Sequence, residues 1–562
     1  MSVSLDPTSR LATLEGDHFD VIVIGGGIIG AGIARDAALR GLRVALFEKR
    51  DFGSGTTAGS TRLIHGGLRY LEMLDFRLVR MDLRERETLL RIAPHLVKPL
   101  EFIIPFYRSS FFYRAKMKIG MTLYDFLSYD KSLPRHHFLT PAELKKIEPN
   151  LRQHGLQGAA VYFDAQANSP ERLCLENIID AREHGAQTFN YCEATGAART
   201  GDTIDGVHVR DLLSDDQPDV TIKARIVINA SGPWFDRVAT GFTNGSRAAT
   251  PARAQIRTTK GIHIACPPVT SRAFVVFSRV DGRLMFLIPW LGHSWIGTTD
   301  TDFTDDPATV KATAKDVDYM LRSVTEYFPT LDTARIYFSN AGVRALVKEE
   351  GSESSVSRMH RISYATPRGL PARGPRDGAR SGAENLVSVL GGKITGYRAI
   401  AEEAVDVVCS KLNVDVPCLT AQNPLPGART DKKPADVSNA VLKDQTIAHL
   451  HALYGGRSSE VIQLASLHEH LREPLSTHTP DIAAQVIFAA RTEQCTRLVD
   501  FLLRRTLLGF SQDQGQSAAA RVASLLAQEL GWNSERMNAE LQLYQDHIAI
   551  TQSFRDRNSQ AQ

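Results

Sequence analysis

Three glycines near the N-terminus have the spacing of a dinucleotide-binding turn. Gly25, Gly27 and Gly30 follow a run of β-branched apolar residues and precede a helical pattern. In such a turn the first glycine permits the tight bend, the second lets a pyrophosphate approach the backbone, and the third lets helix and strand pack closely. The next strand ends in Glu48, an acid placed to accept hydrogen bonds from a ribose. The pattern predicts a dinucleotide site, and a glycine turn in an ordinary βαβ unit is the alternative.

Two later turns bear on the choice between NAD and FAD, which the first motif leaves open. A buried strand runs into Ala230-Ser-Gly232, which is similar to the second FAD-contacting motif of two-domain flavoproteins. Another strand ends in Gly391-Gly392 and opens a helix, and such a helix N-terminus favours an anion. These turns favour FAD, and we expect it to be held non-covalently. The other residues expected to contact the cofactor are Thr57, Ser60 and Thr395.

Residues 51–70 combine small hydroxyl residues and glycines with a basic, aromatic end. Such a composition fits backbone that passes a ligand, and a flexible surface loop is the alternative. The ligand interpretation is favoured because a loop has no need for His65, Arg69 and Tyr70 behind it. Cations held in fixed geometry suit an anionic substrate such as a phosphate.

Longer motifs in this part of the chain resemble a known family. Residues 62–72 (RLIHGGLRYLE), 76–80 (FRLVR) and 89–99 (LLRIAPHLVKP) resemble FAD-dependent glycerol-3-phosphate dehydrogenase. The similarity covers most of residues 19–420 and continues more weakly to about residue 545. It implies oxidation of sn-glycerol 3-phosphate to dihydroxyacetone phosphate, with hydride transfer to FAD and electrons passed to a membrane quinone.

The resemblance also implies a set of substrate-site residues. Phosphate binding is expected from Arg69, Tyr70, Arg358 and Lys393, and Thr299 is expected at the substrate as well. Lys393 and the helix after it would also favour the anionic reduced flavin. The chain departs from the pattern of the family at residues 168–173, Ala345, Met359 and Gly396. The resemblance therefore implies no role for these residues.

Alcohol oxidation also needs an acceptor for the hydroxyl proton. His263, on a short strand, is the best candidate because histidine titrates near neutral pH, and a structural strand histidine is the alternative. Arg344 is the competitor, since it is placed to stabilise a developing alkoxide. His65 lies on the flavin-side segment, where it would orient either group. No metal is required, and the sequence shows no metal-ligand cluster.

The whole chain has the composition of a globular protein of roughly two to four domains. Of its 562 residues, 43% are apolar and 23% charged, and the net charge of +3 is too small to indicate nucleic-acid binding. Six cysteines without C-x-x-C spacing suit a reducing compartment and argue against a disulfide framework. The first residues contain no secretory signal, and no stretch approaches the length of a membrane span.

The expected fold class is α/β, as in D-amino-acid-oxidase-like two-domain flavoproteins. It combines a Rossmann-like FAD-binding domain, an interleaved and mainly antiparallel β substrate domain, and a helical C-terminal domain without a catalytic constellation. The helical pattern of the last domain predicts helices over residues 483–507 and 517–530. The expected segments are an N-terminal arm (1–18), FAD-binding segments (19–100, 155–240, 384–412), substrate-binding segments (101–154, 250–365), a linker (425–434), the helical domain (435–545) and a tail (546–562).

Residues 111–127 mix aromatic and apolar side chains with Arg114, Lys116 and Lys118. This composition fits a helix lying on a membrane surface, and a helix packed on the core with its lysines in water is the alternative. We therefore expect a cytoplasmic protein peripheral to a bacterial inner membrane. Its expected partners are sn-glycerol 3-phosphate, a membrane quinone and the membrane surface. No nucleic-acid partner is expected, and the sequence leaves open whether the protein forms a homodimer.

Two other functions remain open. A glycerol-3-phosphate oxidase that produces hydrogen peroxide shares these motifs, although such oxidases often carry an insertion where this chain has only the short loop 366–383. A flavin-bearing binding protein without turnover would lack the substrate cations. Against that, the chain has Arg69, Arg344, Arg358 and Lys393.

Overall fold

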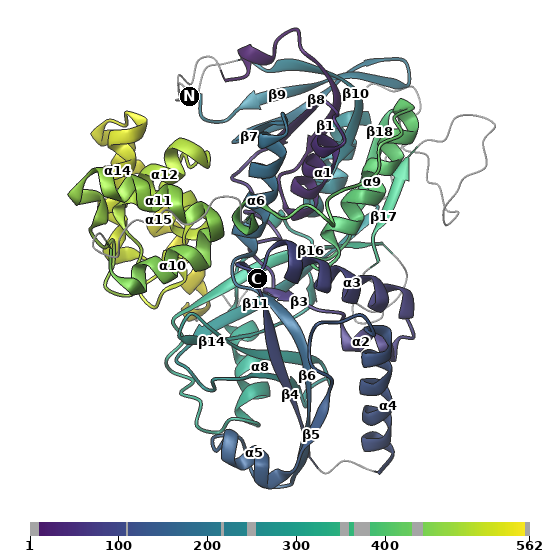
Figure 1. Ribbon diagram of the computed structural model, residues 1–562, viewed down its shortest axis with the longest axis vertical. Coiled ribbons are helices and arrows are strands. Elements are labelled where there is room, and N and C mark those ends of the chain that lie inside the picture. Colours follow the sequence, from purple (N-terminus) through teal and green to yellow (C-terminus); the bar gives the residue numbers. More distant parts are fainter. Residues whose placement is uncertain are drawn as a thin grey trace, which may run out of the picture.

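Two sheets and a helical domain make up the part of the chain that the computed structural model describes (Figure 1). In Figure 1 one sheet lies above the other, and helices α10 to α15 lie beside them. The expected α/β fold with an interleaved antiparallel domain is confirmed. The structure describes residues 10–107, 111–214, 218–243, 254–348, 359–364, 383–429 and 442–556, with the backbone alone at residues 69, 72 and 111–114.

The first sheet has eight strands, and β1 (His18–Ile24) lies at its centre, parallel to β2 (Val44–Glu48) and β10 (Val220–Asn229). Val21 and Ile22 of β1 pack into separate apolar cores, one on each face of the sheet. A strand covered on both faces needs apolar residues without alternation, which is the pattern that the sequence shows. The other elements of this region are α1 (Ile28–Leu39), α6 (Pro170–Glu183), β7 (Gln187–Asn190), β8 (Cys192–Thr200), β9 (Thr203–Asp211), α7 (Phe235–Thr243), β17 (Arg361–Tyr364), β18 (Leu386–Leu390) and α9 (Tyr397–Leu412).

The second sheet has ten strands, and among the described pairs only β12 with β4 is parallel. The residues that form this sheet do not coincide with the expected substrate-binding segments. In particular, β6 (Leu156–Ala167) pairs along its length with β4 (Val97–Tyr107). Residues 97–100 and 156–167 therefore belong to this sheet. The other elements are β3 (Leu63–Ile64), α2 (Leu68–Glu72), α3 (Phe76–Ile92), α4 (Phe111–Leu127), β5 (His137–Leu139), α5 (Pro141–Ile147), β11 (Ile256–Cys266), β12 (Ala273–Phe277), β13 (Leu284–Trp290), β14 (His293–Gly297), β15 (Thr301–Asp302), α8 (Ala314–Thr325) and β16 (Phe338–Val347).

The helical domain differs from the sequence-based expectation at two places. The single helix expected over residues 483–507 stops at Thr492, and the chain passes through Gln494 at φ +50° before it becomes helical again. The last helix continues past residue 545 to Gln552, and Phe554 then packs into the core of the second sheet. The helices are α10 (Asp444–Tyr454), α11 (Ser458–Leu467), α12 (Ala483–Thr492), α13 (Leu498–Asp500), α14 (Gln516–Leu530) and α15 (Ser534–Gln552).

Both ends of the described chain are packed. Leu11 and Leu14 are buried in a core of the first sheet, so this part of the expected N-terminal arm is attached. At the other end Arg555 donates a 2.6 Å hydrogen bond to the carbonyl of Ile336. Within the described ranges, no helix combines the length and the apolar character that crossing a bilayer requires.

Candidate active site

A cavity of about 1020 Å³ lies between the two sheets and takes its wall from both. Of the expected site residues, Gly30, His263 and Thr299 do not contribute to this wall. Arg358 lies outside the described residues, as does the side chain of Arg69. The expected residues that line the cavity are Gly25, Gly27, Glu48, Thr57, Ser60, Tyr70, Ala230, Gly232, Arg344, Gly391, Gly392, Lys393 and Thr395.

The glycine-rich turn has the geometry that a pyrophosphate needs. A Cβ at Gly30 would lie 1.9 Å from the carbonyl oxygen of Gly25, so Gly30 serves close packing and not ligand contact. A Cβ at Gly27 would meet only the hydroxyl of Thr57, at 3.7 Å, so the space beside Gly27 belongs to the cavity. Helix α1 begins here, at Ile28, with its N-terminus at the cavity wall. Backbone N–H groups and the positive end of the helix dipole suit a diphosphate in this space.

Thr57 holds the start of this helix from the opposite loop. Its Oγ1 accepts a 3.1 Å hydrogen bond from the backbone N–H of Ile28, one of the first-turn groups that lack a partner within the helix. The same loop reaches the second sheet, because the Thr56 hydroxyl donates to the carbonyl of Val343 at 2.6 Å. A Cβ at Gly59 would lie 2.5 Å from the Cα of Gly342. The loop therefore joins the FAD-binding turn to β16, the strand that carries Arg344.

Glu48 at the end of β2 has the position of a ribose-binding acid. Its carboxylate accepts hydrogen bonds from the backbone N–H groups of Gly26 at 2.7 Å and Arg50 at 2.8 Å. Burial raises the pKa of Glu48 above its usual value, against these two N–H groups, which lower it. A carboxylate has about four acceptor positions, so acceptor capacity remains for ribose hydroxyls.

The two later turns face the same cavity. After β10, Asn229 Oδ1 accepts from both the backbone N–H and the hydroxyl of Ser231, which fixes the turn that contains Gly232. After β18, Gly391 and Gly392 have φ of +71° and +101°, in the region that favours glycine. These turns and the first one supply backbone, not bulky side chains, along the cavity wall. The described residues therefore fit an extended dinucleotide such as FAD.

Lys393 follows the last of these turns and carries a charge into the cavity. Its ammonium group forms an ion pair with Asp82 of α3 and lies 4.3 Å from the centre of the Tyr70 ring. Burial raises the pKa of Asp82 to about 6, although Lys393 lowers it. Thr395 fixes the neighbouring segment, since its hydroxyl accepts from the backbone N–H of His65 at 3.1 Å. Gly396 precedes α9, and a Cβ there would lie 3.4 Å from Asp82 Oδ1.

Arg344 is held by several contacts on the cavity wall. Its guanidinium donates to Asp300 Oδ1 at 3.0 Å and to the Thr298 hydroxyl at 2.7 Å. A Cβ at Gly261 would lie 2.2 Å from Arg344 Nη2, so the guanidinium lies directly against the backbone of β11. Asp300 also pairs with Arg283, at 3.4 Å, which places a second guanidinium on the cavity wall.

Thr299 does not have the expected position. Its side chain is buried, and its hydroxyl accepts a 3.0 Å hydrogen bond from the backbone N–H of Ile262. Its neighbours Thr298 and Asp300 line the cavity instead. The alternation of side chains around this turn therefore turns Thr299 toward β11 and away from a substrate.

His263 lies behind the cavity wall. Its side chain is fully buried and stacks on Trp295, with ring centres 5.2 Å apart. Its Nε2 is 3.0 Å from the hydroxyl of Thr61, which does line the cavity. Burial, with Arg344 and Arg62 nearby, holds the pKa of His263 well below its ordinary value. Among the described residues, His65 is the histidine on the wall itself.

Four cavity residues were missed by the sequence analysis. Thr61, Arg283, Thr298 and Asp300 all lie in or beside stretches that drew attention, but nothing in their local spacing marks them. Thr298 and Asp300 meet Arg344 because β11 pairs with β14 and β16, which places His263 opposite Gly297 and Thr259 opposite Arg344. Strand register of this kind would have been the signal, and one sequence does not reveal it.

Comparisons with known proteins agree with this geometry. Residues 20–391 match the family described as "FAD dependent oxidoreductase", and residues 418–537 match "C-terminal domain of alpha-glycerophosphate oxidase". The chain is 39% identical to a glycerol-3-phosphate dehydrogenase of Synechocystis, covering 95% of this chain and 97% of that protein. It is 30% identical to an alpha-glycerophosphate oxidase of Lactococcus lactis, covering 93% and 94%.

A solved structure extends the likeness to the whole fold. The glycerol-3-phosphate dehydrogenase of Bacillus halodurans, complexed with FAD, superimposes with a TM-score of 0.75 at 26% identity and covers 97% of each chain. The match includes the helical domain as well as both sheets, because only a few per cent of either chain is left over. The chain thus belongs to the family of FAD-dependent glycerol-3-phosphate dehydrogenases and oxidases.

Proposed function

We propose that the protein oxidises sn-glycerol 3-phosphate to dihydroxyacetone phosphate, for which bound FAD supplies the hydride acceptor. The observation that carries the proposal is that Arg344, Arg283 and Lys393 line the same cavity as the three backbone turns that fit FAD. Fixed cations of this kind suit a phosphate ester. The names of the relatives from Synechocystis and Bacillus halodurans support the same substrate. Arg69, Tyr70 and Arg358 complete the proposed phosphate site.

The proton of the substrate hydroxyl is proposed to reach His263 through Thr61. With its proton on Nδ1, His263 accepts from the Thr61 hydroxyl at Nε2, and that hydroxyl in turn accepts from the substrate. Arg344 and Arg62 disfavour a positive charge on His263, and the negative charge of a dianionic substrate would offset their effect. Arg344 stabilises the negative charge that develops on the substrate oxygen. His65 is a second candidate because it lines the cavity directly.

Anaerobic addition of glycerol 3-phosphate tests the reaction. Bleaching of the flavin absorbance supports turnover, whereas a binding protein would retain its oxidised spectrum. Thr61→Val and His263→Asn should both slow the bleaching, while His65→Asn should not. The reverse result would transfer the role of proton acceptor to His65.

Arg358→Ala tests the phosphate site. It should raise KM strongly while flavin stays bound, because loss of a charge-assisted phosphate contact costs on the order of 2–4 kcal/mol in a desolvated site. An unchanged KM would remove Arg358 from the site.

The electron acceptor is proposed to be a membrane quinone, reached by peripheral attachment at the cytoplasmic face of an inner membrane. Support comes from large apolar side chains that are exposed on α4 and after α2. Leu74 follows α2 and is 71% exposed, and Ile119 and Phe126 of α4 are 68% and 71% exposed. The opposite face of α4 packs on the core through Met121 and Tyr124, as in the core-packed alternative.

Two measurements separate this proposal from the oxidase that the Lactococcus relative represents. Oxygen uptake with substrate should stay slow both in the presence and in the absence of a quinone. An oxidase would instead consume oxygen and release peroxide. Exchange of Arg114, Lys116 and Lys118 for glutamate should release the protein from anionic liposomes, since each charge contributes about 1 kcal/mol near such a surface. Lys145→Glu with Lys146→Glu, on α5, is the matched control. Undiminished sedimentation of the triple variant would refute attachment through α4.

A further inference from the structure

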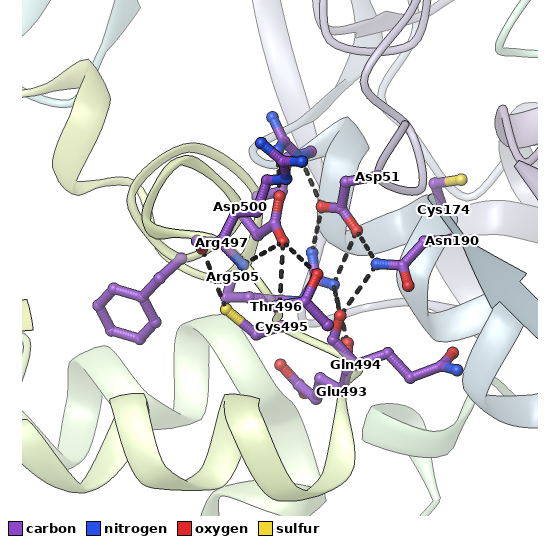
Figure 2. A network of polar contacts seen from close by, with 12 residues as sticks. Asp51, Cys174, Asn190, Glu493, Gln494, Cys495, Thr496, Arg497, Asp500 and Arg505 are labelled. Carbon is purple, nitrogen blue, oxygen red and sulfur yellow. Dashed lines mark hydrogen bonds and ion pairs between the residues drawn. The ribbon is translucent and has the colours of Figure 1, made fainter. Parts of the chain in front are cut away.

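A buried network of charges connects the helical domain to the loop that follows β2 (Figure 2). On the helical side it begins at a π-helical turn, Phe501–Arg505, from which Arg504 and Arg505 both reach Asp51. On the other side Asp51 follows β2 and comes three residues after Glu48. Turns of π-helix are rare and are frequently found at functional sites. This one places two neighbouring arginines on one carboxylate.

Four donors hold the carboxylate of Asp51. Arg505 binds both oxygens, with Nη1 to Oδ2 at 2.6 Å and Nη2 to Oδ1 at 2.9 Å. Arg504 Nε donates to Oδ2, and Asn190 Nδ2 donates to Oδ1 at 2.9 Å. A carboxylate offers about four acceptor positions, so this one is filled. Bidentate arginine contacts fix direction as well as distance, and Asp51 is therefore immobile relative to the helical domain.

The loop that starts at Asp51 determines the shape of the glycine-rich turn. The backbone N–H of Gly53 donates to the carbonyl of Gly26, the middle glycine of the turn, at 2.9 Å. The N–H of Gly26 in turn donates to Glu48 at 2.7 Å. Farther along the loop, Thr57 accepts from Ile28 at the start of α1. A short path thus runs from Arg505 through the Asp51 carboxylate, the backbone from Asp51 to Gly53 and the Gly53–Gly26 hydrogen bond to the middle of the glycine-rich turn.

A second set of contacts fixes Arg505 itself. Its Nη2 donates to the carbonyl of Glu493 at 2.8 Å, and the carboxylate of Glu493 binds Arg172 of α6 at 2.9 and 3.0 Å. Burial works to raise the pKa of Asp51 and of Glu493, but their arginine partners hold both at about 2. All of these groups are therefore charged at neutral pH. Buried ion pairs are often no more stabilising than apolar side chains of the same volume, so stability alone does not account for them.

We propose that Asp51 and Arg505 are positioning residues, through which the helical C-terminal domain holds the glycine-rich turn in the conformation that binds FAD. The helical domain then contributes to cofactor binding without touching the cofactor. Because such coupling is reciprocal, bound FAD also favours the docked state of the helical domain.

The test measures flavin release from the holoenzyme, followed by the rise in flavin fluorescence, together with the FAD dissociation constant. Asp51→Asn keeps the shape of the side chain and removes the charge that both arginines bind. It should weaken FAD binding by about tenfold, within the usual range of coupling between sites. Arg505→Lys keeps the buried charge and so preserves folding, but one ammonium cannot bind both oxygens of Asp51 and the carbonyl of Glu493. It should change FAD release in the same direction.

Asp481→Asn is the matched control. Asp481 is fully buried like Asp51, but it binds His449 and Gln485 inside the helical domain. Its exchange should lower the thermal unfolding temperature and leave FAD release unchanged. Hydrogen exchange at residues 53–58 should rise in Asp51→Asn and Arg505→Lys but not in Asp481→Asn. Folded Asp51→Asn or Arg505→Lys protein that binds FAD as tightly as the wild type would overturn the proposal.

Discussion

The cavity has two proposed binding regions, which we call its FAD end and its substrate end after the molecules proposed to occupy them, and the two are built in different ways. At the FAD end the wall is backbone, in the turns at Gly25–Gly27, Ala230–Gly232 and Gly391–Gly392. At the substrate end it is charged side chain, with Arg344 and Arg283 sharing Asp300. Backbone N–H groups bind any phosphate that fits the space, whereas a network of side chains fixes the position of each charge.

This difference predicts how each end fails. A turn that depends on the absence of side chains should fail completely when a side chain is added. A network of several hydrogen bonds should lose activity step by step as single partners are removed. FAD content and catalytic efficiency therefore become separate measures of the two ends.

Gly27→Val should have the largest effect. Its side chain would enter the space proposed for the pyrophosphate, while the nearest protein atom to a Cβ there is Thr57 Oγ1 at 3.7 Å. The protein should therefore fold and purify without colour. Gly30→Ala offers a contrast, because its Cβ would lie 1.9 Å from the Gly25 carbonyl and should destabilise the fold as well. Normal flavin absorbance in Gly27→Val would contradict the placement of the cofactor.

Gly261→Ala should disturb the substrate end alone. The new methyl group would occupy the place of the Arg344 guanidinium and displace it from Thr298 and Asp300. Loss of one positioned donor to a developing charge typically lowers kcat by about 100-fold or more. We expect that loss in kcat/KM with full flavin content. Gly120→Ala, where a Cβ would have no atom within 4 Å, is the control. Equal activity of both variants would show that Arg344 does not act on the substrate.

The same difference explains what the sequence could predict. The turn at Gly25, the acid Glu48 and the parallel strands around them were predictable because their signals are local spacing and apolar runs. Thr299 was assigned to the substrate but faces Ile262, since its orientation depends on pairing with a distant strand. The expected helix over 483–507 ends at Thr492, and the next residue, Glu493, binds Arg172, 321 residues away in the chain. Contacts of that kind leave no local signal.

Asp300→Asn should have a moderate effect. The amide keeps the shape of the side chain but withdraws the charge that Arg344 and Arg283 share. A hydrogen bond to a charged group contributes about 1.5–3 kcal/mol, so kcat/KM should fall by about 10- to 100-fold. The control is Asp302→Asn, which breaks a partly exposed pair with Arg257 on the neighbouring strand and should leave kcat/KM unchanged. If the two variants behave alike, the shared carboxylate does not organise the substrate end.

The smallest effect is expected at Asp82, the partner of Lys393, and it depends on pH. The pKa of Asp82 is raised to about 6 in the folded protein, mainly by burial, from 3.8 as the ordinary value. At a pH well below 3.8 the carboxyl is protonated in both states and contributes nothing. As the pH rises from 4 to 6 the unfolded chain ionises first, so the folded state becomes relatively less stable, and above pH 6 the full difference of about 3 kcal/mol applies.

Asp82→Asn removes this titration, so a comparison of the variant with the wild type at several pH values should reveal it. We compare the variant with the wild type by subtracting the wild-type unfolding temperature from that of the variant. This difference should be about 2 °C higher at pH 7 than at pH 4. The shift is small because the unfolding entropy, which converts about 3 kcal/mol into a temperature change, is large in a chain of this length. Most of the change should fall between pH 4 and pH 6. A difference that stays constant from pH 4 to pH 7 would mean that Asp82 ionises at its ordinary pKa in the folded protein, and that it pairs with Lys393 as a carboxylate over this whole range.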